Sequence, residues 1–336
     1  MNTLDPGASP APDAMMIPDE EQLDRSQSGE RDYLRLIERL SHQSVVKHFD
    51  AYADIAWDAP EMRVDPSDPR WELRADEPLA MTAWYRAQPP EIRSAIGLHT
   101  TASFAKIGLQ FESILKRGLL EFAETLPNGA PEFRYVYHEV IEEAQHSLMF
   151  QELINRTGLD IDGMPGWMRV AGRLVARLGR TFPELFFVFV LGGEDPIDHV
   201  QRMMLRHKET MHPLLRRISQ IHVTEEARHL SFARHYLRRN VPRLGFVKQL
   251  VLRLRTPLIL AQMSRLMMRP SRKVVETYGI PREVIEEAYL RNPRQREHTI
   301  EALAKVRSLC AEVGIADGWA VPLWRCLGLW PTPAPA

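Results

Sequence analysis

Residues 143–146 read Glu-Ala-Gln-His, and residues 226–229 read Glu-Ala-Arg-His. In an α-helix, positions i and i+3 share one face a turn apart, so each stretch would present a carboxylate beside an imidazole. A single glutamate precedes each pair at a similar distance: Glu112 lies 31 residues before Glu143, and Glu194 lies 32 residues before Glu226. Two such pairs, with one glutamate from each of two further helices, form the ligand set of a two-metal site inside a four-helix bundle.

Helical periodicity extends along most of the chain, and strand-like alternation is nearly absent. We expect helices at 32–46, 91–124, 131–155 and 166–177, from Pro183, from Pro213, and at 242–268 (kinked at Pro257), 282–290 and 295–313. Residues 50–90 are rich in proline and tryptophan, which indicates an irregular segment with one short helix. The 48 residues between His146 and Glu194 leave room for the long crossover of a ferritin-like bundle. The predicted fold is all-α, a ferritin-like four-helix bundle core with additional helices.

The composition is that of an ordinary globular protein. Of the 336 residues, 44% are hydrophobic and 26% charged, and the net charge is -1, which argues against a nucleic-acid or anionic-membrane partner bound through bulk charge. The longest apolar run, residues 185–191, is far shorter than the ~20 residues that a membrane span needs. Two cysteines, Cys310 and Cys326, are too few for a disulfide scaffold. The N-terminal stretch does not resemble a signal peptide, so we expect a cytoplasmic protein.

Both ends of the chain differ in composition from the middle. Residues 1–30 are rich in proline, serine, glycine and acidic residues, and they hold few large apolar side chains that could repay the entropy of ordering. We therefore expect a disordered tail at 1–30 and a second short tail in the final WPTPAPA. A single helical domain is expected at 31–330.

The simplest alternative to a metal site is that the two motifs form solvent-exposed polar faces of their helices. That alternative requires the motif side chains to point outward, yet Glu143 is in phase with Val136 and Phe150, and Glu226 is in phase with Ile218. Unpaired glutamate is almost never fully buried, so a buried acid needs a compensating cation. A third Glu-x-x-His copy at 209–212 is set aside, because Pro213 follows directly and disfavours helical geometry at His212.

Two further candidates, Glu194 and His222, each have an alternative reading. Glu194 follows Gly192-Gly193 and precedes Pro196, which predicts either a local helix distortion at a functional site or the end of one helix and the start of another. His222 lies four residues before Glu226 on the same stripe, where it is either a third imidazole ligand or a core histidine. Glu139, Glu142 and Asp198 lie one turn from predicted ligands and could orient the histidines, or be surface acids.

The charges of the ligand set favour two metal ions. Four carboxylates carry a summed charge of -4, which balances two divalent cations. A mixed carboxylate and imidazole shell without thiolates suits iron or manganese, whereas structural zinc sites are usually four-coordinate. A site of this kind would have these ligands: Glu112, Glu143, His146, Glu194, His222, Glu226 and His229.

This pattern resembles the p-aminobenzoate N-oxygenase family of di-iron arylamine oxygenases. His222 is the feature that separates the family from other two-iron bundles. The resemblance implies a homodimer with two iron ions that uses O₂ to convert an aryl amine to a nitro group through hydroxylamine and nitroso stages. It points to the chloramphenicol-type enzyme, hence to the biosynthesis of a nitroaryl antibiotic.

The chain has no dinucleotide-binding motif, so electrons would come from an external donor, of the ferredoxin or flavin-reductase type. Two other readings remain: a C–H oxygenase or desaturase of the same bundle class, and a non-catalytic iron-binding bundle. Fold alone does not separate these functions.

Overall fold

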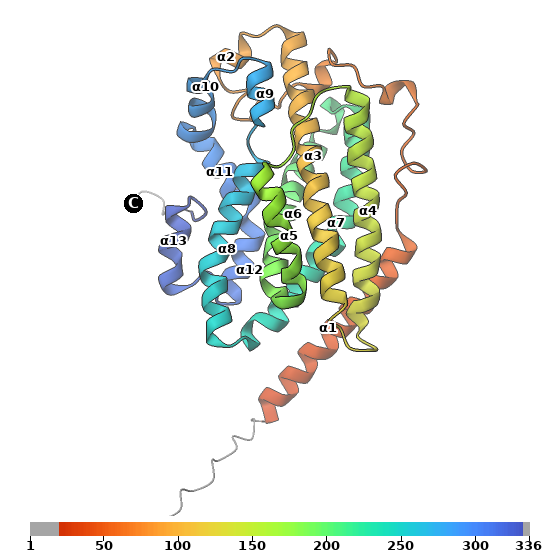
Figure 1. Ribbon diagram of the computed structural model, residues 1–336, viewed down its shortest axis with the longest axis vertical. Helices are drawn as coiled ribbons and strands as arrows, with labels where there is room; N and C mark the ends of the chain where they lie inside the picture. The colour runs from red at the N-terminus through yellow and green to blue at the C-terminus, as the bar shows by residue number, and fades with distance from the viewer. Residues whose placement is uncertain (1–19, 332–336) are drawn as a thin grey trace, which may run out of the picture.

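Four long helices form the core of the computed structural model, which describes residues 20–331. They are α3 (Pro90–Ala123), α4 (Pro131–Thr157), α6 (Pro183–Arg206) and α7 (Pro213–Asn240). Helix α3 packs against α4, and α6 packs against α7 (Figure 1). Each helix begins at a proline, whose fixed φ suits the first helical position and whose missing N–H would have no partner there. Every regular element in residues 20–331 is helical, so the all-α, ferritin-like bundle is confirmed.

The crossover between the two helix pairs contains α5 (Gly166–Thr181), which packs on α3 and α6 from outside. Its inner face consists of small residues, including Gly172, Ala176 and Gly179, all buried. A β-carbon on Gly179 would lie 1.9 Å from the carbonyl oxygen of Gly118 on α3. The missing side chains let α5 approach closely, so it covers the helices that carry Glu112 and Glu194.

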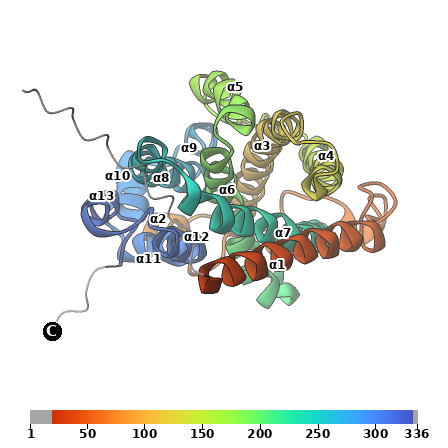
Figure 2. The same ribbon diagram turned by 90° about the horizontal axis from the view of Figure 1, so that it is seen from below.

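The remaining helices surround this core. Helix α1 (Glu20–Val46) packs against α4 and α7, and Figure 2 shows it alongside α7. The others are α2 (Ala83–Arg86), α8 (Phe246–Met267), α9 (Arg272–Thr277), α10 (Arg282–Glu286), α11 (Pro293–Ala302), α12 (Ala304–Glu312) and α13 (Val321–Cys326). Single turns of 3₁₀ helix occur at Pro60–Met62, Pro69–Trp71, Lys208–Thr210, Val241–Arg243 and Gly318–Ala320, and a π turn at Glu287–Arg291. None of the helices within 20–331 combines the length and apolar character needed to cross a membrane.

The predicted tail at 1–30 requires a correction. Residues 20–30 belong to α1, and residues 1–19 lie outside the described part of the chain. Within this stretch, Glu30 forms ion pairs with Arg239, at 2.5 Å, and with Arg243, at 3.8 Å, which anchor this part of α1. Local composition could not reveal partners that are more than 200 residues away. The expected tail at the other end falls mostly on residues 332–336, which also lie outside the described range.

The predicted helix at 295–313 is divided in two. Helix α11 ends and α12 begins at Leu303, which is fully buried in the main core. The Arg307 guanidinium donates a 2.8 Å hydrogen bond to the carbonyl oxygen of Ile300, which satisfies one acceptor that the break leaves free. Helices α9 and α13 were not predicted, since each is only six residues long.

Helix α6 runs unbroken through Gly192, Gly193 and Pro196, so the reading in which a helix ends before Glu194 is wrong. The glycines instead make room for neighbours. A β-carbon on Gly193 would lie 2.3 Å from the ring of Phe111, and one on Gly192 would lie 3.0 Å from Cδ2 of Leu260. Close packing therefore explains the glycine pair.

We predict that Gly193→Ala and Gly192→Ala differ in stability although the positions are adjacent. Gly193→Ala must displace the buried Phe111 ring and should lower the free energy of unfolding by roughly 1–3 kcal/mol. Gly192→Ala meets only the end of a flexible leucine and gains helix propensity, so it should stay within about 1 kcal/mol of the wild type. Urea unfolding followed by circular dichroism measures both, and equal stabilities would contradict this account of the glycines.

Candidate metal centre

The seven predicted ligand side chains come together inside the bundle. Each is at most 1% exposed. Helix α3 contributes one, α4 two, α6 one and α7 three, in the order Glu112, Glu143, His146, Glu194, His222, Glu226 and His229. Six of them form three overlapping groups of three, within each of which the ligand atoms lie no more than 4.8 Å apart, and His229 belongs to a fourth such group with Glu143 and Glu139. The spacing argument thus located one cluster, and no predicted ligand lies outside it.

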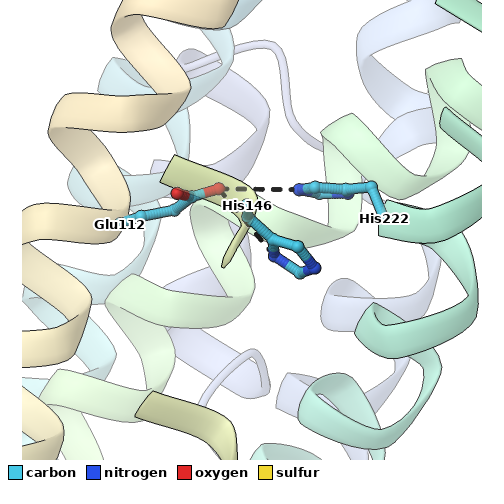
Figure 3. A group of neighbouring side chains, drawn as sticks. All are labelled: Glu112, His146 and His222. Carbon is cyan, nitrogen blue, oxygen red and sulfur yellow. Dashed lines mark ion pairs between the residues drawn. The ribbon is translucent and has the colours of Figure 1, made fainter. Parts of the chain in front are cut away.

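Glu112 joins two of the imidazoles, as Figure 3 shows. Its Oε1 lies 3.9 Å from Nδ1 of His146 and 3.8 Å from Nε2 of His222. Glu194 forms a group with His222 and Glu226 at the same end of the cluster. His222 therefore faces carboxylates from α3 and α7, and its role as a metal ligand stays a prediction.

Glu143 and Glu226 lie between the two ends of the cluster. Oxygens of both are 3.5 Å from Nδ1 of His146. Oε1 of Glu143 is also 3.0 Å from Nδ1 of His229, and Oε1 of Glu226 is 3.1 Å from the same nitrogen. A carboxylate has two oxygens that can serve two cations, so these glutamates are placed to bridge a pair of metal ions.

A second layer of charged side chains holds two of the imidazoles in place. Nε2 of His146 lies 2.9 Å from Glu225, and Nε2 of His229 lies 2.7 Å from Glu142. Each motif helix therefore supplies the carboxylate that orients the histidine of the other. Arg228 links the two carboxylates, with Nη2 2.9 Å from Glu142 and 3.6 Å from Glu225. Because Nε2 of each of these two histidines is bonded to a carboxylate of this outer layer, Nδ1 of each faces the predicted ligands Glu143 and Glu226.

Three acids were predicted to orient the histidines, and the structure places them differently. Glu142 binds a histidine as expected, but Asp198 does not: it accepts hydrogen bonds from Arg202 and lies 3.6 Å from Lys305. Glu139 is buried and has no hydrogen-bond partner among the described residues. Glu225 was missed, although the matching Glu-Glu-Ala-x-His at 142–146 and 225–229 could have revealed it.

A lysine and a serine that the sequence analysis missed hold Glu112. Ser147 Oγ donates a 2.8 Å hydrogen bond to Oε2 of Glu112, and Lys116 Nζ donates to Ser147 and, at 3.0 Å, to the carbonyl oxygen of Glu143. Lys116 lies one turn after Glu112, and Ser147 directly follows His146. Their positions next to predicted ligands were the feature of the sequence that could have revealed both residues.

The third Glu-x-x-His copy takes no part in the cluster. Glu209 is exposed. His212 is buried elsewhere, where it stacks on Trp71 at 4.2 Å between ring centroids and accepts a hydrogen bond from the backbone N–H of Leu214 at the start of α7. The reason for setting this copy aside is confirmed, because His212 is the residue that caps the following helix.

Comparison with known proteins agrees with this geometry. The family model of p-aminobenzoate N-oxygenase AurF matches residues 30–314. The chain belongs to the AurF family. It is 41% identical, over 88% of its length and 86% of theirs, to the uncharacterized proteins Mb0909 of Mycobacterium bovis and Rv0885 of Mycobacterium tuberculosis. No solved structure matches the chain. The AurF family is a family of di-iron oxygenases, so the match confirms the family that the resemblance predicted.

The unpaired atoms of the cluster test whether it fits a metal pair of the AurF type. Among the buried atoms without a hydrogen-bond partner are oxygens of all four predicted glutamate ligands and Nδ1 of His146: Glu112 Oε1, Glu143 Oε1 and Oε2, Glu194 Oε2 and Glu226 Oε2. Buried charge left without a partner is costly, and two divalent cations would satisfy these oxygens. The residues therefore fit the group. Carboxylate and imidazole without thiolate is a donor set that suits iron.

Burial and mutual repulsion shift the pKa values of this cluster. Burial, with the charge of Glu143, raises the pKa of Glu112 to about 8, and burial with Glu226 holds the pKa of Glu194 well above its usual range. Burial alone would lower the pKa of His229, but the surrounding carboxylates hold it well above its usual value. Burial and the neighbouring His146 hold the pKa of His222 well below the usual value. Glu112 and Glu194 thus keep their protons to a higher pH than ordinary carboxyl groups do.

We predict that Glu112→Gln stabilises the metal-free protein, and increasingly so as the pH rises. Above pH 4.5, the ordinary pKa of the group, the unfolded chain releases a proton that the folded protein keeps up to about pH 8, so the wild type loses stability over this range. Glutamine removes that loss. The difference in free energy of unfolding between variant and wild type should grow from pH 5 to pH 8 in urea titrations with a chelator present. A constant difference would refute the raised pKa.

A second prediction concerns the carboxylates that orient the histidines. Glu225→Ala and Glu142→Ala should each weaken metal binding about 10–100-fold, because an imidazole that has lost its acceptor is no longer held in position. The control is Glu152→Ala, which removes a carboxylate of α4 that pairs with Arg156 and lies away from the cluster. Anaerobic competition with a chelator gives the affinities. Wild-type affinity in both variants would show that the imidazoles need no such support.

Proposed function

We propose that this protein is a di-iron arylamine N-oxygenase, which converts an aryl amine to a nitroaryl product through hydroxylamine and nitroso stages. The observation that carries the proposal is the position of His222 in a chain of the AurF family. Nε2 of His222 lies 3.8 Å from oxygens of both Glu112 and Glu226, so a third imidazole joins the usual set of four carboxylates and two histidines.

The residues available to hold iron divide into two ends and a middle. Glu112, His146, Glu194 and His222 would hold the ion at one end, His229 would hold the ion at the other, and Glu143 and Glu226, which lie between, would serve both. When bound, two iron ions would activate O₂ and supply oxygen atoms to the amine nitrogen. The four carboxylates, with a summed charge of -4, neutralise two Fe²⁺ ions.

The other residues of the centre keep this arrangement fixed and dry. The predicted ligands are almost fully buried, which excludes bulk water and strengthens each electrostatic contact. Glu142 and Glu225 hold the two imidazoles, while Ser147 and Lys116 hold Glu112. Ligands held in this way need little rearrangement during turnover.

The finer parts of the proposal concern substrate and partners. Arg228, a candidate clamp for a benzoate, is already engaged by Glu142 and Glu225, and Arg117 is exposed. This favours an aryl amine without a carboxylate, as in the chloramphenicol-type reading and the biosynthesis of a nitroaryl antibiotic. An external electron donor of the ferredoxin or flavin-reductase type, a homodimer and a cytoplasmic location complete the proposal.

We predict that the protein, loaded with two irons per chain and chemically reduced, consumes a para-substituted aniline in the presence of O₂. Hydroxylamine, nitroso and nitro products should appear in that order, because oxygen is added to the same nitrogen step by step. An aniline with a neutral polar substituent should compete with p-aminobenzoate. With ¹⁸O₂, mass spectrometry should find the label in the nitro group. Label derived only from water, or oxidation at carbon with the amine intact, would favour the C–H oxygenase instead.

A further inference from the structure

Glu139 is a buried carboxylate that the seven-ligand set leaves without a role. It lies on α4, one turn before Glu143, and is 1% exposed. Neither of its carboxylate oxygens has a hydrogen-bond partner among the described residues. A buried carboxylate without a partner is costly, so this position in the core calls for a compensating cation.

The position of Glu139 relative to the cluster indicates where such a cation would bind. Glu139, Glu143 and His229 each offer a ligand atom, and these atoms lie within 4.8 Å of one another. No other acid outside the predicted set takes part in such a group in the described part of the chain. Glu139 therefore borders the His229 end of the metal centre.

The contacts of the histidines exclude an orienting role for Glu139. Nε2 of His229 is bonded to Glu142, and its Nδ1 faces Glu143 and Glu226. Nε2 of His146 is bonded to Glu225. No ring nitrogen of either histidine is left for Glu139.

Glu139 on α4 occupies the position that matches His222 on α7. Glu139 precedes Glu143 by four residues, as His222 precedes Glu226. Both therefore lie one turn before a bridging glutamate and on its face of the helix. Helix α7 has an imidazole at this position, and α4 has a carboxylate.

We propose that Glu139 is an eighth protein ligand, which binds the metal ion at the His229 end of the centre. This rests on the proposed two-metal centre and extends it, since the two ions acquire different surroundings. Glu139 would supply an added anionic oxygen ligand to that ion, which would favour a higher charge on it. His222, a neutral ligand, serves the other end of the cluster.

Anaerobic Co²⁺ loading tests the proposal without turnover. Visible absorption of Co²⁺ reports its coordination number, and chelator competition reports its affinity. Glu139→Gln keeps the shape but removes the charge, so one of the two ions should bind at least about tenfold more weakly, with an altered spectrum. Glu139→His, which copies the residue at the matching position of α7, should restore binding of that ion with a shifted spectrum.

The matched control is Glu132→Gln, which also alters a buried glutamate of α4, one whose carboxylate lies 3.2 Å from Arg239. It should bind two ions with the wild-type spectrum. Wild-type affinity and spectrum in folded Glu139→Gln would overturn the ligand role while leaving the centre intact. Failure of Glu139→His to restore the ion would count against it as well. A wild-type protein that binds fewer than two ions would overturn the centre itself, and the proposed function with it.

Discussion

Burying several carboxylates together is the constraint on which this structure depends. Burial away from water, together with repulsion between the like charges, raises the pKa values of Glu112 and Glu194. A bundle can tolerate such a core only if cations neutralise it or if the ligands share protons. The surrounding hydrophobic core, with aromatic clusters such as Phe187, Phe232 and Tyr236, must supply stability that the centre does not.

The charged layer around the centre also joins the two helix pairs. Glu142 of α4 and Glu225 of α7 each bind the histidine of the opposite helix, and Arg228 contacts both. Breaking one contact leaves a buried charge without a partner, which is more costly than the contact itself is stabilising. The same interactions therefore fix the imidazoles and the separation of α4 and α7, so that fold and site geometry depend on each other.

Which features could be predicted from the sequence depends on how far apart along the chain the interacting residues lie. The long helices and the seven clustered side chains were predictable, because spacing along one helix determines which residues share a face. Contacts between helices were not: Glu225 binds a histidine 79 positions away, and Glu30 extends α1 through partners on and just after α7. Asp198 failed as an orienting residue because two cations engage it: Arg202 lies one turn later on α6, a spacing that the sequence shows, whereas Lys305 on α12 is a contact between helices. The break at Leu303 likewise depends on burial against distant elements.

The two halves of the centre have similar sequence spacing, but the contacts that hold their upstream glutamates differ. Glu112 and Glu194 are similar in spacing, and Glu112 accepts a hydrogen bond from Ser147, which in turn accepts one from Lys116. Oε2 of Glu194 has no hydrogen-bond partner among residues 20–331. Glu194 is nevertheless confined, because Gly193 packs against Phe111. One carboxylate is thus held by directed hydrogen bonds, and the other is confined by the packing of its helix.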